Sequence, residues 1–128
     1  MYRPTRVAFD TLPFCMEFIW GNLTQVINTQ SEYDSIVLKK STLCPPKIDF
    51  LKHSLLGQHV TAKSCLVPDY KISVMKDDVQ KEINYRLRII QYGYCDIARF
   101  SYKWILIPKI PNSYKVVFEK EFITRELF

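Results

Sequence analysis

Positively charged side chains are concentrated between residues 84 and 109, where five of them accompany a single acid, Asp96. The segment therefore carries a local charge of +4, from five positive charges against one negative. Side chains of this kind can hold the phosphates of nucleic acid or of an anionic membrane without reading base identity. We predict an anion-binding face on a sheet, made of Arg86, Arg88, Arg99, Lys103 and Lys109. RNA and an anionic lipid surface stay open as partners, because their phosphates look alike to arginine.

Part of this segment, YGYCDIARFSYKWILIPK at residues 92 to 109, interleaves aromatic and basic residues. Single-strand binders need both kinds on one exposed face, so that bases stack while phosphates meet cations. A period of two instead puts residues 100, 102, 104 and 106 on one face, and Arg99, Ser101 and Lys103 on the other. The aromatic residues are therefore expected mainly in the core. The alternative to an anion-binding face is a solvated face whose cations pair with Glu82 and Asp96.

Two histidines, His53 and His59, are the only imidazoles available for catalysis. Their spacing of six does not place both on one helical face for a metal. The sequence also lacks a nucleophile elbow, a phosphate-binding glycine loop and a spaced set of carboxylate ligands. We predict no catalytic residue, metal or cofactor, and an enzyme with a Cys or Ser and a His that meet in space is the least favoured hypothesis.

Four cysteines, Cys15, Cys44, Cys65 and Cys95, are separated by 29, 21 and 30 residues, a spacing that fits neither a zinc site nor a redox pair. The first residues, MYRPTRVAFDTLPF, lack the continuous apolar region of a secretory signal, and no apolar run reaches the length of a transmembrane segment. We therefore predict four reduced thiols in a cytoplasmic or nuclear protein. On that basis the glycosylation sequon Asn22-Leu23-Thr24 is a chance match.

Composition predicts one globular domain, residues 1–128, since 48% of the residues are hydrophobic and only three are glycine. Residues 14–20 alternate as a strand does, a helix is expected from Ser31 to the prolines at 45 and 46, and a second helix over residues 47–56. Later segments alternate with a period of two, most cleanly at residues 79–92, which should form a central strand. The predicted fold class is α+β, with an antiparallel sheet of roughly five to seven strands, one or two helices in the N-terminal half and a short C-terminal helix or edge extension.

The net charge of +5 and the pI of about 9.0 favour an anionic partner. The leading hypothesis is a small, basic, non-enzymatic binding or assembly protein, similar in composition to viral matrix or accessory proteins. Its alternative is an interaction module that inhibits or bridges a host or cellular protein. A homo-oligomer is expected in either case, with interface residues predicted at Tyr92, Tyr94, Tyr114 and Phe122.

Overall fold

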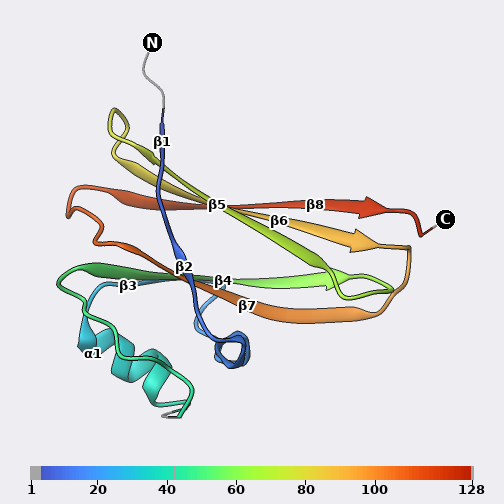
Figure 1. Ribbon diagram of the computed structural model, residues 1–128, viewed down its shortest axis with the longest axis horizontal. Helices are drawn as coiled ribbons and strands as arrows, with labels where there is room; N and C mark the ends of the chain where they lie inside the picture. The colour runs from blue at the N-terminus through green and yellow to red at the C-terminus, as the bar shows by residue number, and fades with distance from the viewer. Residues whose placement is uncertain (1–3, 42, 128) are drawn as a thin grey trace.

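The computed structural model describes residues 4–41 and 43–127, and within them the chain is mostly β-structure (Figure 1). Eight strands form two four-stranded sheets, one in the order β1-β5-β6-β8 and one in the order β2-β7-β4-β3. The two sheets pack face to face around a common core of large apolar side chains. The molecule is therefore a β-sandwich, and the predicted α+β class is wrong.

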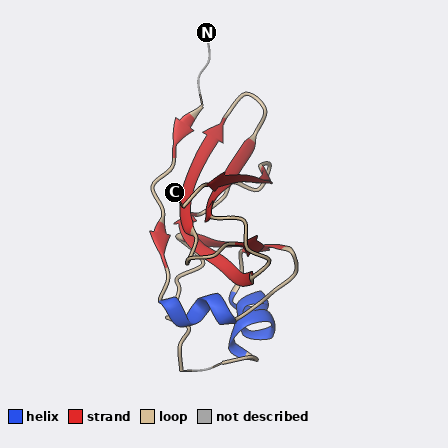
Figure 2. Ribbon diagram, turned by 90° about the vertical axis from the view of Figure 1, so that its right-hand side faces the viewer, coloured by secondary structure: helices blue, strands red, loops and turns tan. Residues whose placement is uncertain are grey.

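Four strands are short or lie early in the chain: β1 (Thr5–Arg6), β2 (Asp10–Thr11), β3 (Thr24–Ile27) and β4 (His53–Lys63). The other four are β5 (Asp69–Asp77), β6 (Glu82–Tyr92), β7 (Ala98–Pro108) and β8 (Lys115–Arg125). Helical structure in the described residues is confined to the 3-10 helix η1 (Phe14–Phe18) and to α1 (Gln30–Tyr33), which continues into the π-helical turn η2 (Asp34–Leu38). Figure 2 shows these helical segments gathered at one side of the molecule.

Strand β6 is the central strand that its alternation predicted. It lies between β5, which is antiparallel to it, and β8, which is parallel. Ile83, Tyr85, Leu87 and Ile89 are buried on its inner face, while Arg86 and Arg88 are exposed on its outer face. Apolar side chains of β4 and β7 complete this core from the opposite sheet.

Strand β7 pairs with β4 rather than with β6, over eleven antiparallel residue pairs. The predicted anion-binding face required the strands over residues 79–92 and 94–107 to be neighbours. They are not, because the turn between them carries the chain from one sheet to the other. Tyr102 and Trp104 are buried as predicted, under η1 and the short helix, but Phe100 is 58% exposed. Both faces of β7 are covered along much of its length, so Lys103 faces the space between the sheets instead of an open outer surface.

Two predicted elements have a different structure: residues 14–18 form η1 instead of a strand, and residues 53–63 form β4 where a helix was expected over residues 47–56. The C-terminal segment forms the edge strand β8, so of its two predicted alternatives the extension of the sheet is the one observed. The helix near Ser31 exists, but Thr29 is its N-cap: its hydroxyl accepts a hydrogen bond from the Glu32 amide at 3.2 Å. A carboxylate oxygen of Glu32 in turn accepts a hydrogen bond from the backbone N–H of Asn28 at 3.1 Å, and the N-cap lies two residues before Ser31.

All four cysteines form disulfides, Cys15–Cys44 and Cys65–Cys95, with Cα–Cα distances of 6.1 and 5.1 Å. Both distances lie within the usual range for a disulfide. The prediction of four reduced thiols is wrong, since spacing along the chain says nothing about which cysteines meet in space. The first bridge ties η1 to the segment after the short helix, and the second joins the β4–β5 and β6–β7 connections. No helix within the described residues is long and apolar enough to cross a membrane.

Candidate binding surfaces

The five predicted anion-binding residues are divided between the two sheets. Arg86 and Arg88 lie on the outer face of β6, whereas Arg99, Lys103 and Lys109 lie on β7 or just after it. Since β6 and β7 belong to different sheets, these residues share no common face. Their role in anion binding stays a prediction, but its geometric premise is wrong.

The two arginines of β6 are paired with acids of β8. Arg86 lies 2.9 Å from a carboxylate oxygen of Glu119, and Arg88 lies 3.2 Å from one of Glu121. Both pairs follow from the parallel register, which sets each arginine opposite its glutamate. The predicted alternative of paired cations is thus realised with different acids, because Glu82 pairs with Lys115 and Asp96 with Lys63.

The three cations of β7 also have acceptors within the chain. The guanidinium of Arg99 donates to the backbone carbonyls of Ser64 and Cys65, both at 3.1 Å. Lys103 forms an ion pair with Glu17, and Lys109 donates to the backbone carbonyl of Asn28. A phosphate would therefore have to compete with groups that already neutralise or hold each of these side chains.

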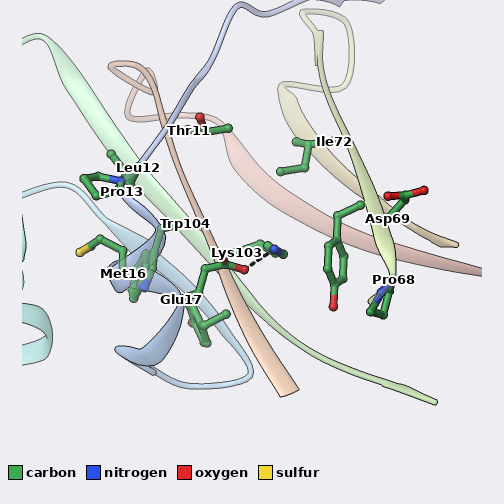
Figure 3. A pocket seen from close by; sticks show the side chains of 12 residues that line it. Thr11, Leu12, Pro13, Met16, Glu17, Pro68, Asp69, Ile72, Lys103 and Trp104 are labelled. Atoms are coloured by element: carbon green, nitrogen blue, oxygen red, sulfur yellow. Dashed lines mark hydrogen bonds and ion pairs between the residues drawn. The ribbon is translucent and has the colours of Figure 1, made fainter. Parts of the chain in front are cut away.

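A cavity of about 390 Å³ opens between the sheets at the Glu17–Lys103 pair (Figure 3). The two charged groups point toward each other across it, and their side chains are only 22% and 15% exposed. Ser101 donates a further hydrogen bond to Glu17 at 2.5 Å. The ammonium of Lys103 also lies 3.8 Å from the ring centroid of Tyr70, a cation–π contact. Glu17 and Lys103 thus neutralise each other, and Asp69, which also lines the cavity, accepts a hydrogen bond from the Tyr92 hydroxyl. The ion pair connects η1 to β7, and the cation–π contact connects β7 to β5 in the opposite sheet.

Neither histidine lies in a nucleophilic arrangement. The ring of His59 packs against Trp20, at 4.6 Å between centroids, and near Phe100. Burial lowers the pKa of His59, and the positive charge of Lys120 lowers it further. Within the described part of the chain, no hydrogen bond joins either histidine side chain to a hydroxyl group, and every cysteine sulfur is in a disulfide. The cysteine form of the enzyme hypothesis therefore has no thiol in this structure.

The four predicted interface residues do not form one surface. Tyr94 is 78% exposed beside the Cys65–Cys95 bridge, and the hydroxyl of Tyr92 bonds to Asp69. Phe122 is 49% exposed on β8. Tyr114 bonds to Asp78 near the start of β8, whereas Tyr92 lies opposite Arg125, the last residue of β8. At the usual rise per residue of a strand, the two tyrosines are roughly 30 Å apart.

A larger exposed apolar surface lies on η1 and the adjoining sheet. We define the aromatic surface as the side chains of Phe14, Phe18, Trp20 and Phe100, which are 72%, 71%, 38% and 58% exposed. Phe14 and Phe18 contact each other edge to face at 5.4 Å, and Trp20 lies 6.1 Å from Phe100. Phe14, Phe18 and Phe100 also line one groove, of about 350 Å³, together with Val67 and Pro68.

The sequence interpretation missed this surface because it assigned a strand to FCMEFIW. A strand would bury Phe14, Met16 and Phe18 together, whereas the 3-10 turn buries Met16 and leaves the two phenylalanines outside. The signal for a helical turn was present: Pro13 precedes the segment, and proline favours the position before or at a helix start.

The chain matches no protein-family model, and neither curated proteins nor solved structures show a significant similarity to it. Its function is therefore argued from its own residues.

Proposed function

We propose that this protein is a non-enzymatic interaction module that binds another protein through the aromatic surface. The observation that carries the proposal is the exposure of four large aromatic side chains from two distant parts of the chain on one face. Contiguous exposed apolar surface is costly in water and marks interaction sites, and aromatic residues supply much of the binding energy at such sites. Burying one such side chain contributes roughly 1.5–3 kcal/mol.

The groove between the phenylalanines supports a protein as the partner. Its walls combine aromatic rings with Val67 and Pro68. The charged side chains that also line it are held within the chain, Arg99 by backbone carbonyls and Lys103 and Glu17 by each other. Such a lining suits an apolar anchor from another protein better than a phosphate.

We also propose that the protein works in an oxidising compartment. Disulfides form and persist outside the cytosol, where thiols are not kept reduced, and both disulfides here close loops of about thirty residues. This proposal replaces the cytoplasmic expectation, whose premise of reduced thiols is wrong.

The test attaches a photo-crosslinker to three forms of the protein: the wild type, a variant of the aromatic surface and a control variant. It compares the proteins that each form captures. The double variant Phe14→Ser/Phe18→Ser removes half of the aromatic surface, and both side chains are exposed, so folding should persist. The matched control is Leu51→Ser/Val79→Ser, which removes two side chains of similar exposure, 90% and 68%, from distant loops. We expect a protein captured by the wild type and the control, and a loss of affinity of at least about tenfold for the aromatic variant once that protein is purified.

Three results would contradict the proposal. Equal capture by all three forms would move the contact to another surface. Self-association lost in the aromatic variant would identify a second copy as the partner. Steeply salt-dependent binding to RNA or anionic vesicles, lost in Arg86→Glu/Arg88→Glu, would restore the anion-binding hypothesis.

A further inference from the structure

The sequon Asn22-Leu23-Thr24 lies on the surface, where the connection from η1 enters β3. All three residues are exposed, and Leu23 is 73% exposed. It is the only one of the chain's four asparagines that is followed two residues later by serine or threonine. Glycosylated asparagines need this pattern and an accessible position.

The backbone of Asn22 is held while its side chain is free for modification. Its amide donates to the side-chain oxygen of Gln25 at 3.2 Å, and its carbonyl accepts from the Tyr102 hydroxyl at 2.7 Å. Among the described residues, its carboxamide has no hydrogen-bond partner. A substituent on the side-chain nitrogen would therefore break none of the contacts that hold this connection.

The position also leaves room for a bulky group. Strand β3 is the outermost strand of its sheet, and Thr24 is its first residue. A chain attached just before an edge strand extends into solvent and shields an edge that could otherwise pair with another molecule.

We propose that Asn22 carries an N-linked oligosaccharide, and this inference rests on the proposed oxidising compartment. The donor is an oligosaccharide carried on a lipid diphosphate. The side-chain nitrogen of Asn22 forms a bond to the anomeric carbon and gives up one proton, while the bond between that carbon and the phosphate oxygen breaks and the lipid diphosphate leaves. No oxidation or reduction takes place. The two disulfides place the chain in the kind of compartment where this transfer occurs.

The oligosaccharide would border the aromatic surface without covering all of it. Trp20 is two residues from Asn22, and Leu23 is adjacent, so the first sugar has apolar side chains within reach. Phe14 and Phe18 lie farther from Asn22 along the chain, on η1, and line the groove.

The experiment expresses the full chain, with a cleavable leader, in eukaryotic secretory cells and measures the mass of the secreted protein. The wild type should lose mass on treatment with an N-glycan-releasing amidase, which converts Asn22 to aspartate, and peptide mass spectrometry should locate that change. Asn22→Gln and Thr24→Ala should abolish the mass shift, and Thr24→Ser should keep it. Asn28, Asn84 and Asn112 serve as internal controls and should stay unmodified.

Alkylation of free thiols in the same samples tests the compartment separately. Secreted protein with both disulfides and an unmodified Asn22 would overturn this inference and leave the proposed compartment and binding function standing. A mass shift that persists in Thr24→Ala would place the carbohydrate on another residue and would also overturn it. Secreted protein with free thiols would contradict the proposed compartment, whatever its carbohydrate.

Discussion

Lys103 of β7 contacts both η1 and the opposite sheet. It lies between the sheets, paired with Glu17 of η1 and stacked on Tyr70 of β5. A partly buried charge that loses its partner keeps its desolvation cost, whereas removing both charges removes that cost. Removing one charge of the Glu17–Lys103 pair should therefore lower the free energy of unfolding more than removing both charges does.

Replacing Lys103 with methionine should lower the free energy of unfolding by about 2 kcal/mol, because Glu17 would remain without its cation. The double variant Lys103→Met/Glu17→Gln should recover most of that loss. Urea unfolding followed by circular dichroism measures both. If the double variant were no more stable than the single one, the loss would come from packing against Tyr70 instead.

Gly57 is the residue where the absence of a side chain decides packing. A Cβ atom at this position would lie 2.3 Å from a ring carbon of Tyr102 and 2.6 Å from one of Trp104, both buried on β7. Gly57→Ala should therefore destabilise the protein by about 1–3 kcal/mol through overpacking. Gly21→Ala is the matched control in urea unfolding, since its closest neighbour, at 2.9 Å, is the flexible end of Gln25. Equal stability of the two variants would contradict the close packing of β4 on these rings.

Buried tyrosines make the fold sensitive to alkali. Burial raises the pKa of Tyr33 to about 12, from the ordinary value of 10.0, and also raises the pKa values of Tyr85 and Tyr102. Because the folded state holds these protons more tightly, their contribution to stability is complete below pH 10 and is lost as the pH rises toward 12. We expect absorbance at the wavelength of tyrosinate to rise together with the loss of circular dichroism in this range. Tyr33→Phe should make the loss of stability between pH 10 and 12 shallower. Ionisation of all tyrosines near pH 10 in a protein that stays folded would contradict this prediction.

The secondary structure of β8 is set by its pairing with β6 and not by its local sequence pattern. Phe118 and Phe122 are four residues apart, which suits one face of a helix as well as one face of a strand. Parallel pairing with β6 satisfies the backbone of one side of the segment and sets Phe118 opposite Tyr85, with 5.8 Å between their rings. The same register places two glutamates opposite two arginines.

The ion pairs between β6 and β8 should contribute little, since their side chains are about half exposed. A double-mutant cycle on Arg88→Ala and Glu121→Ala should give a coupling energy below about 1 kcal/mol. This coupling should fall further in 1 M salt, where screening acts within about 3 Å. Unfolding midpoints at low and high salt provide the measurement. A coupling of several kcal/mol that salt does not change would show that the pair is buried in solution.

Two disulfides crosslink segments of the whole molecule that are far apart in the chain: one joins η1 to the segment after η2, and the other joins the β4–β5 and β6–β7 connections. Each closes a loop of about thirty residues, for which the loss of unfolded-state entropy amounts to about 3.6 kcal/mol. Together they tie the helical side and the β4–β5 and β6–β7 connections to the sheets.

Purified protein from an oxidising expression host should contain no free thiols by alkylation and mass spectrometry, and four after reduction. Cys65→Ser/Cys95→Ser and Cys15→Ser/Cys44→Ser should each be less stable than the wild type by about 2–4 kcal/mol. Each variant is the control for the other. Four free thiols in folded, fully stable protein would contradict both the bridges and the proposed compartment.

The period of two in the sequence was enough to predict the buried face of β6. It placed Ile83 and Tyr85 in the core, because adjacent residues of a strand point to opposite sides whatever the strand pairs with. For β7 it predicted the burial of Tyr102 and Trp104, but neither the exposure of Phe100 nor the position of Lys103 between the sheets. The same reasoning wrongly predicted a strand at residues 14–18 and left the C-terminal segment open between a helix and a strand, since short apolar patterns fit more than one period.

The pairing of strands, the pairing of cysteines and the gathering of aromatic residues at the surface are visible only in the folded molecule. Each of these depends on contacts between segments far apart in the chain, as in the pairing of Cys15 with Cys44 or the approach of Trp20 to Phe100. Local periodicity is the same for every arrangement of the strands in sheets, and so it carries no record of these contacts. For that reason the period of two places the five cations on one face, although they lie on two sheets.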